Sequence, residues 1–191
     1  DYTCWHVISY NNDGTVESKQ TFQGKNDDSS WARGQAWAIY GYTACFRETN
    51  DSIFLNFAKD IANMIMERVK TEDAIHYWDY DAPVTKETPR DVSAASVTAS
   101  AMIELSTMVP DGQKYLDYAE KILKSLSSDA YLAKVGDNQG FILMHSVGSL
   151  PNGSEIDTPL NYADYYYLEA LKRFMELKKL RVEHGELRMI Q

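Results

Sequence analysis

The helical patterns in this chain are of two kinds, and their order along the sequence restricts the fold more than any other feature. Residues 52–69 and 113–126 repeat apolar side chains on one helix face with charged side chains opposite, as in helices on the outside of a protein. Residues 31–47, 91–108 and 162–177 are small or apolar nearly all round near their starts, which is typical of helices buried on every side. The order therefore predicts an all-α fold in which inner and outer helices alternate.

The two longest connections, residues 71–90 and 128–161, each lead into a predicted inner helix. They bring their residues to the end of the layer where inner helices begin, so we expect a functional site there, lined by loops and helix N-termini. Short extended segments are expected near residues 6–9 and 141–144. Residues 181–191 are polar without apolar periodicity and are expected to form a tail.

The first predicted inner helix opens at Ser30 with the sequence Ser-Trp-Ala-Arg-Gly-Gln-Ala-Trp. Ser30 is expected to cap this helix, because its hydroxyl suits the N-cap position. Arg33 and Trp37 are four residues apart and therefore share a face, with Trp31 beside them at the helix start. A guanidinium, free helix N–H groups and flat indole rings together favour an anionic sugar ring. Composition alone equally favours two core tryptophans and a surface charge at Arg33.

The chain of 191 residues is long enough for one domain with a sizeable core and carries a net charge of −9. That charge disfavours binding to nucleic acid or to an anionic membrane, which select basic surfaces, but one local arginine still allows an anionic substrate. No apolar run reaches transmembrane length. Cys4 and Cys45 are expected to be free, buried thiols. Four unclustered histidines predict no metal site, and nothing in the sequence indicates a cofactor.

The longer sequence Ser-Trp-Ala-Arg-Gly-Gln-Ala-Trp-Ala-Ile-Tyr-Gly-Tyr from Ser30 resembles the signature of the unsaturated glucuronyl hydrolases, glycoside hydrolase family 88. The similarity extends from about residue 5 to about residue 177, and ordered motifs over such a span are far more specific than any one of them. The other segments that resemble family motifs, in the family's order, are Gln23-Gly24, residues 77–83, residues 90–95, Gly140-Phe141, residues 145–148 and residues 162–166.

The resemblance implies an (α/α)6 barrel of the six-hairpin glycosidase type, in which six inner and six outer helices close a ring. The chain supplies about half of that ring, so residues 1–180 are expected to be the C-terminal half of such a domain, followed by the polar tail at 181–191. Half a ring leaves inner helices uncovered along two edges. We therefore expect self-association or a missing N-terminal half. The resemblance also implies a bacterial protein, located in the cytoplasm or the periplasm.

In the resembled family, the substrate is an oligosaccharide, released by a lyase, whose non-reducing end is a Δ4,5-unsaturated uronic acid. An Asp protonates C4, water adds at C5, and the hemiketal opens to release the unsaturated sugar. The family's catalytic Asp residues lie upstream of the first motif, and no Asp of this sequence matches them. The resemblance therefore implies no catalytic residue within these 191 residues.

The family's substrate-binding positions do have counterparts in this chain. They are Gln23, Trp31, Arg33, Trp37 and, more loosely, His6. Arg33 is expected to pair with the uronate carboxylate, and the tryptophan rings are expected to stack on the sugars. Phe22 stands where the family often has a histidine, which implies a different substrate preference.

Other hypotheses stay open. The chain is alternatively an inactive sugar-binding or scaffold fragment, or an unsaturated rhamnogalacturonyl hydrolase, although Gln35 and Ala36 favour the glucuronyl type. A helical-repeat interaction protein would show a repeated consensus, and the sequence has none. Asp91 is expected to be a helix N-cap rather than a catalyst. Asp79 is expected either in the pocket or in a solvated loop, and His145 either beside the leaving sugar or in a structural position.

Overall fold

The computed structural model of the chain describes residues 1–183. Five helices, two antiparallel β-hairpins and one 3₁₀ turn follow one another in these residues. In chain order they are β1 (Val7–Tyr10), β2 (Val16–Gln20), α1 (Ala32–Thr49), α2 (Ser52–Arg68), α3 (Val92–Ser106), α4 (Gln113–Leu126), the 3₁₀ turn (Asn138–Gly140), β3 (Ser146–Ser149), β4 (Ser154–Thr158) and α5 (Asn161–Glu183).

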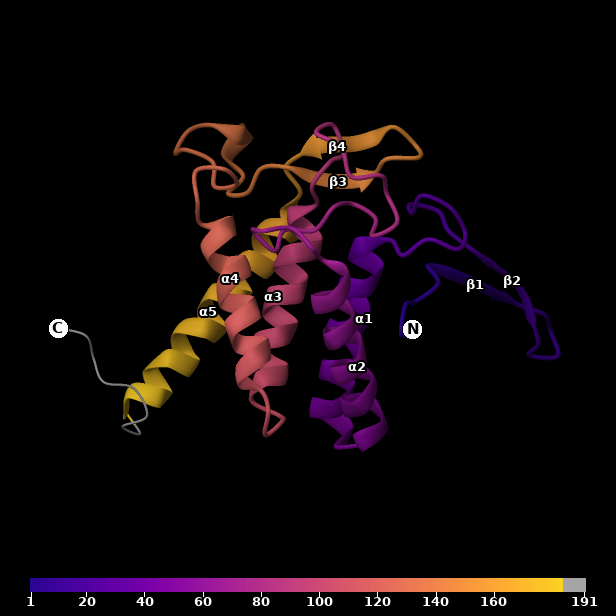
Figure 1. Cartoon of the computed structure of the whole chain (residues 1–191), viewed down its shortest axis with the longest axis horizontal. Coiled ribbons are helices and arrows are strands. Elements are labelled where there is room, and N and C mark those ends of the chain that lie inside the picture. The colour runs from indigo at the N-terminus through magenta and orange to yellow at the C-terminus, as the bar shows by residue number, and fades with distance from the viewer. Residues whose placement is uncertain (184–191) are drawn as a thin grey trace.

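The helices form two layers, as the alternating patterns predict (Figure 1). Helix α3 packs against α1 on one side and α5 on the other, while α2 covers α1 and α4 covers α3. Burial explains the sequence patterns. All of α3 except Glu104 is buried, whereas α4 buries only one face, with Leu116, Ala119 and Ile122 at its centre. The half ring of inner and outer helices is therefore confirmed. None of the helices described is long and apolar enough to cross a membrane.

Local sequence accounts for the starts of two helices. The Asp51 and Asp91 side chains accept hydrogen bonds from the backbone N–H groups of Ile53 (2.9 Å) and Ser93 (3.1 Å), which caps α2 and α3. The N-cap expected at Ser30 is wrong. Helix α1 begins one residue later, with Trp31 at the N-cap and no side-chain cap. A loop carbonyl replaces the cap, because Trp78 O accepts from the N–H of residue 32 at 3.1 Å.

The β3–β4 hairpin lies at the end of the layer where the inner helices begin, and the β1–β2 hairpin lies to the side of the helices (Figure 1). The extended segment expected near residues 6–9 corresponds to β1. The one expected near 141–144 is present as an isolated antiparallel bridge between Leu132 and Leu143. The strands β2, β3 and β4 were not expected. Helix α5 continues through Glu183, so residues 181–183 of the expected tail are helical, and residues 184–191 lie outside the described residues.

Helices α1 and α5 lie at the two edges of the inner layer, and each has one open face among the described residues. The expectation of a buried Cys45 is wrong, because this free thiol on α1 is exposed, whereas Cys4 is half-buried. On α5 the exposed side chains include Tyr165 and Met175. The physical reason is that each of these helices has an inner neighbour, α3, on one side only.

Candidate functional site

The Arg33 guanidinium is the centre of the site at the starts of the inner helices. It is 2% exposed and forms an ion pair with Asp91, with Nη1 2.7 Å from Oδ2. Nη1 also donates to the carbonyl of Val147 at 2.5 Å, and Nη2 donates to the carbonyl of Gly148 at 2.7 Å. Among the described residues Nε–H has no acceptor. Arg33 is thus neither a surface charge nor an unattached cation, because its position is set by α3 and β3.

Asp91 connects three elements through one carboxylate. Its Oδ1 accepts from the N–H and the hydroxyl of Ser93, at 3.1 and 2.6 Å, which caps α3 as expected. Its Oδ2 receives the Arg33 guanidinium from α1, and that guanidinium also binds β3. The Asp91 side chain is fully buried. Both residues had been noted in the sequence, but no signal linked them, because they lie 58 residues apart.

Trp31 is held in a stack beside this ion pair. Its ring lies 4.3 Å from the His6 ring centroid, and the Arg33 Cζ lies 4.6 Å from the Trp31 centroid. Trp31 is 6% exposed, so little of the indole is open to a ligand. Gly34 allows this close approach, since a Cβ there would lie 3.0 Å from Trp31 Cε3, a tight contact.

His6 is held as a neutral imidazole. Burial, and then the positive charge of Arg33, lower its pKa. Its Nδ1 accepts from the backbone N–H of Phe22 at 3.2 Å, which places the proton on Nε2. The amide of Gln23 reaches the same cluster, because its Nε2 donates to the Gly148 carbonyl at 2.8 Å. Gly148 O therefore accepts from both Gln23 and Arg33.

Trp37 lies one turn further along α1 and faces α5. Its ring meets Tyr166 edge-on at 5.1 Å, and Tyr40 meets Tyr166 at the same distance. Four of the five predicted binding residues therefore form one cluster. Trp37 instead contributes to an aromatic wall that continues from this cluster down the inner face of α1 and α5.

Asp79 holds the loop that closes the cluster from outside. It is 1% exposed, and its Oδ2 accepts from the N–H of Lys25 (2.9 Å) and the hydroxyl of Ser29 (2.7 Å). It is therefore a buried structural carboxylate, not the solvated one that its loop suggested. His145 lies on the rim, half-exposed, with Nδ1 2.6 Å from Asp157 Oδ1. In the described residues no group of His, Cys, Asp or Glu side chains is arranged to hold a metal ion.

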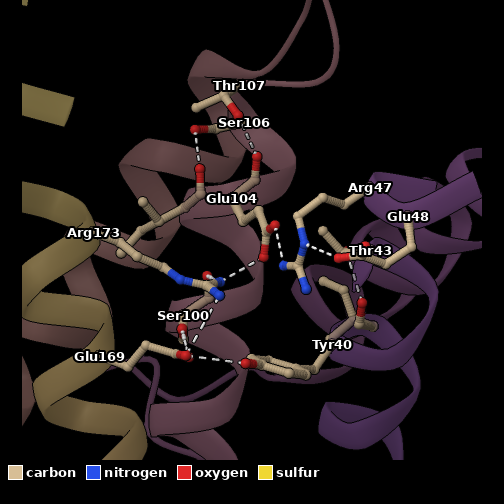
Figure 2. A network of polar contacts seen from close by, with 12 residues as sticks. Tyr40, Thr43, Arg47, Glu48, Ser100, Glu104, Ser106, Thr107, Glu169 and Arg173 are labelled. Carbon is tan, nitrogen blue, oxygen red and sulfur yellow. Dashed lines mark hydrogen bonds and ion pairs between the residues drawn. The ribbon is translucent and has the colours of Figure 1, made fainter. Parts of the chain in front are cut away.

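A second polar network lies further along the same three inner helices (Figure 2). Glu104 of α3 binds Arg47 of α1 at 2.6 Å and Arg173 of α5 at 2.7 Å. Below them Glu169 accepts from the Tyr40 hydroxyl at 3.1 Å. Nothing in the sequence indicates this network, because its members come from three helices and lie far apart along the chain.

The chain is similar to curated hydrolases over nearly all of its length. It is 46% identical to the unsaturated glucuronyl hydrolase of Formosa agariphila over 179 residues, which cover 93% of this chain and 44% of that protein. It is 35% identical to the unsaturated chondroitin disaccharide hydrolase of Streptococcus agalactiae, covering 81% of this chain and 39% of that protein. The chain thus spans less than half the length of these relatives. No family model matches it.

Solved structures agree with the sequence relatives. A crystal structure of an unsaturated glucuronyl hydrolase specific for heparin matches with a TM-score of 0.92 and 57% identity, covering 94% of this chain and 49% of that one. A variant of the Streptococcus agalactiae unsaturated glucuronyl hydrolase complexed with dGlcA-GalNAc6S matches with a TM-score of 0.80 and 32% identity, covering 91% and 47%. Such values show shared architecture and common descent over the matched half.

Proposed function

This chain is homologous to the unsaturated glucuronyl hydrolases over about half of their length, and we propose that it forms the sugar-holding part of such an enzyme. The ligand is an oligosaccharide with an unsaturated uronic acid at its non-reducing end. The whole reaction adds water across C4=C5: a proton joins C4, the water oxygen joins C5, and the resulting hemiketal opens to release the sugar. No Asp of this chain is assigned to the proton transfer.

One observation carries the proposal, namely the fixed guanidinium of Arg33 beside the Trp31–His6 stack. Asp91 and two carbonyl groups orient the guanidinium, while its Nε–H has no acceptor among the described residues. A uronate carboxylate is a strong acceptor for such a donor. The neutral imidazole of His6 adds an Nε2–H donor that suits a sugar hydroxyl.

The aromatic wall of Trp37 and Tyr166 supplies the apolar surface against which a second sugar ring can stack. Gln23 is assigned a supporting role, because its amide holds the Gly148 carbonyl next to Arg33. The preference between heparin-type and chondroitin-type sugars is set by residues around this wall and by Phe22, which is exposed.

Calorimetric titration with an unsaturated chondroitin disaccharide tests the proposal. Arg33→Ala is expected to weaken binding by about 2 to 4 kcal/mol, since a charge-assisted pair is lost. Arg47→Ala is the matched control, because this arginine pairs with Glu104 outside the site. Circular dichroism establishes that each variant is folded. Equal affinity of the Arg33→Ala variant and the wild type would remove Arg33 from the site.

A second measurement separates binding from turnover. The conjugated enol-ether acid of the disaccharide absorbs in the ultraviolet, and its hydration abolishes that absorbance. We expect the 191-residue chain to bind the sugar without absorbance decay, because no Asp in it is assigned to protonate C4. Decay at an enzyme-like rate would instead assign an acid within this chain, and Asp91→Asn and Asp79→Asn would locate it.

A further inference from the structure

A hollow separate from the Arg33 cluster lies between the C-terminal end of α2 and the loop that leads to α3. Its volume is about 620 Å³, within the usual range of small-molecule sites. All of its lining residues come from one stretch of chain, 68–90, and none belongs to the Arg33 cluster. The stretch is firmly anchored between the two sites, since Trp78 is buried against Val147 while Tyr77 lines the hollow.

Arg90 is held in this cavity as a fixed cation. Its Nη1 donates to the carbonyl of Ile75 at 2.5 Å and lies 3.3 Å from Asp73 Oδ1. Its Cζ lies 4.4 Å from the ring centroid of Tyr77, so the guanidinium is stacked on a phenol ring. Within the described part of the chain, Nε–H and the Nη2 hydrogens of Arg90 have no acceptor. They remain available to a ligand.

Two more cations line the cavity, although the protein as a whole is strongly acidic. Arg68 uses Nη2 for Asp81 at 2.7 Å, and its other donors have no acceptor among residues 1–183. Lys70 is exposed at the rim and forms no ion pair with a described residue.

Two carboxylates also lie in the lining, so the three cations exceed the acids there by one. Asp73 is already committed, because its Oδ2 accepts from the Tyr131 hydroxyl at 2.6 Å and its Oδ1 accepts from the N–H of Ile75 at 3.1 Å. These bonds, together with Arg90, lower the pKa of Asp73 although burial opposes the shift. The other acid in the lining, Glu72, is exposed.

We propose that this cavity is an accessory site for an anionic saccharide unit, carboxylated or sulfated. Arg68, Lys70 and Arg90 provide donors for the anionic group. Tyr77 and the apolar side chain of Val84, both in the lining, provide faces for the sugar ring. The sugar identity rests on the proposed function, which supplies anionic oligosaccharides, whereas the site itself rests on the cavity alone.

The test is calorimetric titration of the 191-residue chain with an unsaturated chondroitin 6-sulfate disaccharide. We expect two equivalents to bind to the wild type and one to Lys70→Glu, in which affinity at the cavity falls about tenfold or more. Lys121→Glu makes the same charge change at an exposed position of α4 and is expected to retain both. Arg33→Ala is expected to lose the other equivalent and keep the cavity.

The outcomes separate this inference from the proposed function. Binding that Arg33→Ala abolishes and Lys70→Glu leaves unchanged would overturn the accessory site while retaining the proposed function. Binding that Lys70→Glu removes and Arg33→Ala leaves intact would support the accessory site and count against the proposed function. Inorganic sulfate is the second probe. If it occupies the cavity as tightly as the disaccharide does, the saccharide identity is overturned.

Discussion

Two arginine–carboxylate clusters lie along the same inner helices, and they differ chiefly in their access to water. At the helix starts, the side chains of Arg33 and Asp91 are 3% and 0% exposed. Further along, the Arg47 and Glu104 side chains are 45% and 14% exposed. The bond distances are similar, at 2.7 and 2.6 Å. Distance alone therefore says little about how strongly the fold depends on either pair.

Burial decides what happens when one partner is removed. A charge left alone near water is solvated again, so an exposed pair contributes at most about 1 kcal/mol. A charge left alone in the interior is not solvated again, so the loss of its partner lowers the free energy of unfolding by about 3 to 5 kcal/mol. The buried pair is also the one that orients the proposed substrate donor. We infer that the first cluster sets the geometry of the site, while the second (Figure 2) mainly aligns three helices.

The largest expected effect is that of Asp91→Ala. It removes the partner of Arg33 and the cap of α3 together, so we expect the free energy of unfolding to fall by about 3 to 5 kcal/mol. Urea unfolding followed by circular dichroism measures it. Asp91→Asn is the control, because the amide oxygen can still cap α3 and the loss is expected to be smaller. A loss below about 1 kcal/mol for Asp91→Ala would show that the two clusters are equivalent.

Acid provides the second test, through His76 in the loop before α3. This side chain is fully buried, and its backbone carbonyl accepts from the N–H of Asp91. Burial, and then the charge of Arg90, lower its pKa to about 3, although Asp73 opposes the shift. Below pH 6.5 the unfolded imidazole takes up a proton that the folded one refuses until about pH 3, so stability falls as the pH falls through this window.

The expected loss from His76 at pH 4.5 is about 2.7 kcal/mol, at 1.36 kcal/mol for each pH unit below 6.5. Urea unfolding at pH 7 and pH 4.5 measures it. His76→Leu is the comparison, since a side chain without a titratable group should reduce the difference between the two pH values by that amount. If His76→Leu leaves the difference in free energy of unfolding between the two pH values unchanged, water reaches His76 in the folded protein.

The third effect belongs to the more exposed cluster. Glu104→Gln weakens its pairing with both Arg47 and Arg173, and we expect a loss of about 1 kcal/mol in the free energy of unfolding at low salt. The loss should shrink at 1 M NaCl, where screening operates over about 3 Å. The loss caused by Asp91→Ala should persist in the same salt. If both losses respond equally to salt, the contrast in burial does not govern their energetics.

Much of this architecture could be predicted from the sequence, because helical periodicity is a local property. The bounds 113–126 of α4 coincide with the amphipathic pattern, and the inner helices were recognised by their small or apolar surroundings. The β-hairpins were harder, since β2 and β4 are exposed and show no alternating pattern. The contact of Arg33 with Asp91 joins distant segments, and only the packed structure brings them together.

The candidate site, like the fold, could be predicted only in part. The clustering of Gln23, Trp31, Arg33 and His6 follows the resemblance, whereas their individual surroundings do not follow from it. Arg33 was expected to meet a carboxylate from the substrate, and the structure gives it one from Asp91. Its pairing with a uronate stays a prediction. A buried arginine needs an internal partner, but nothing in the sequence identifies Asp91 as that partner, because the two residues lie 58 positions apart.

Substitution of Tyr40 has the smallest expected effect, and it tests where the boundary between the two clusters lies. Its hydroxyl donates to Glu169 while its ring packs on Tyr166 above. Tyr40→Phe keeps the ring and removes one hydrogen bond to a partly exposed carboxylate, so we expect a loss of about 0.5 kcal/mol, at the low end for a hydrogen bond. Urea unfolding of the variant and the wild type measures it.

The titration of Tyr40 is the more discriminating measurement. Burial, and then Glu169, raise its pKa to about 12. The stabilisation is therefore present below pH 10, the ordinary tyrosine value, and is lost as the pH rises towards 12. The phenolate absorbance of the wild type minus that of Tyr40→Phe isolates this group. A rise in phenolate absorbance near pH 10 would show that Tyr40 is solvated and belongs with the exposed cluster around Glu104. A rise near pH 12 would show that the water-excluded region around Arg33 extends along α1 and α5 as far as Glu169.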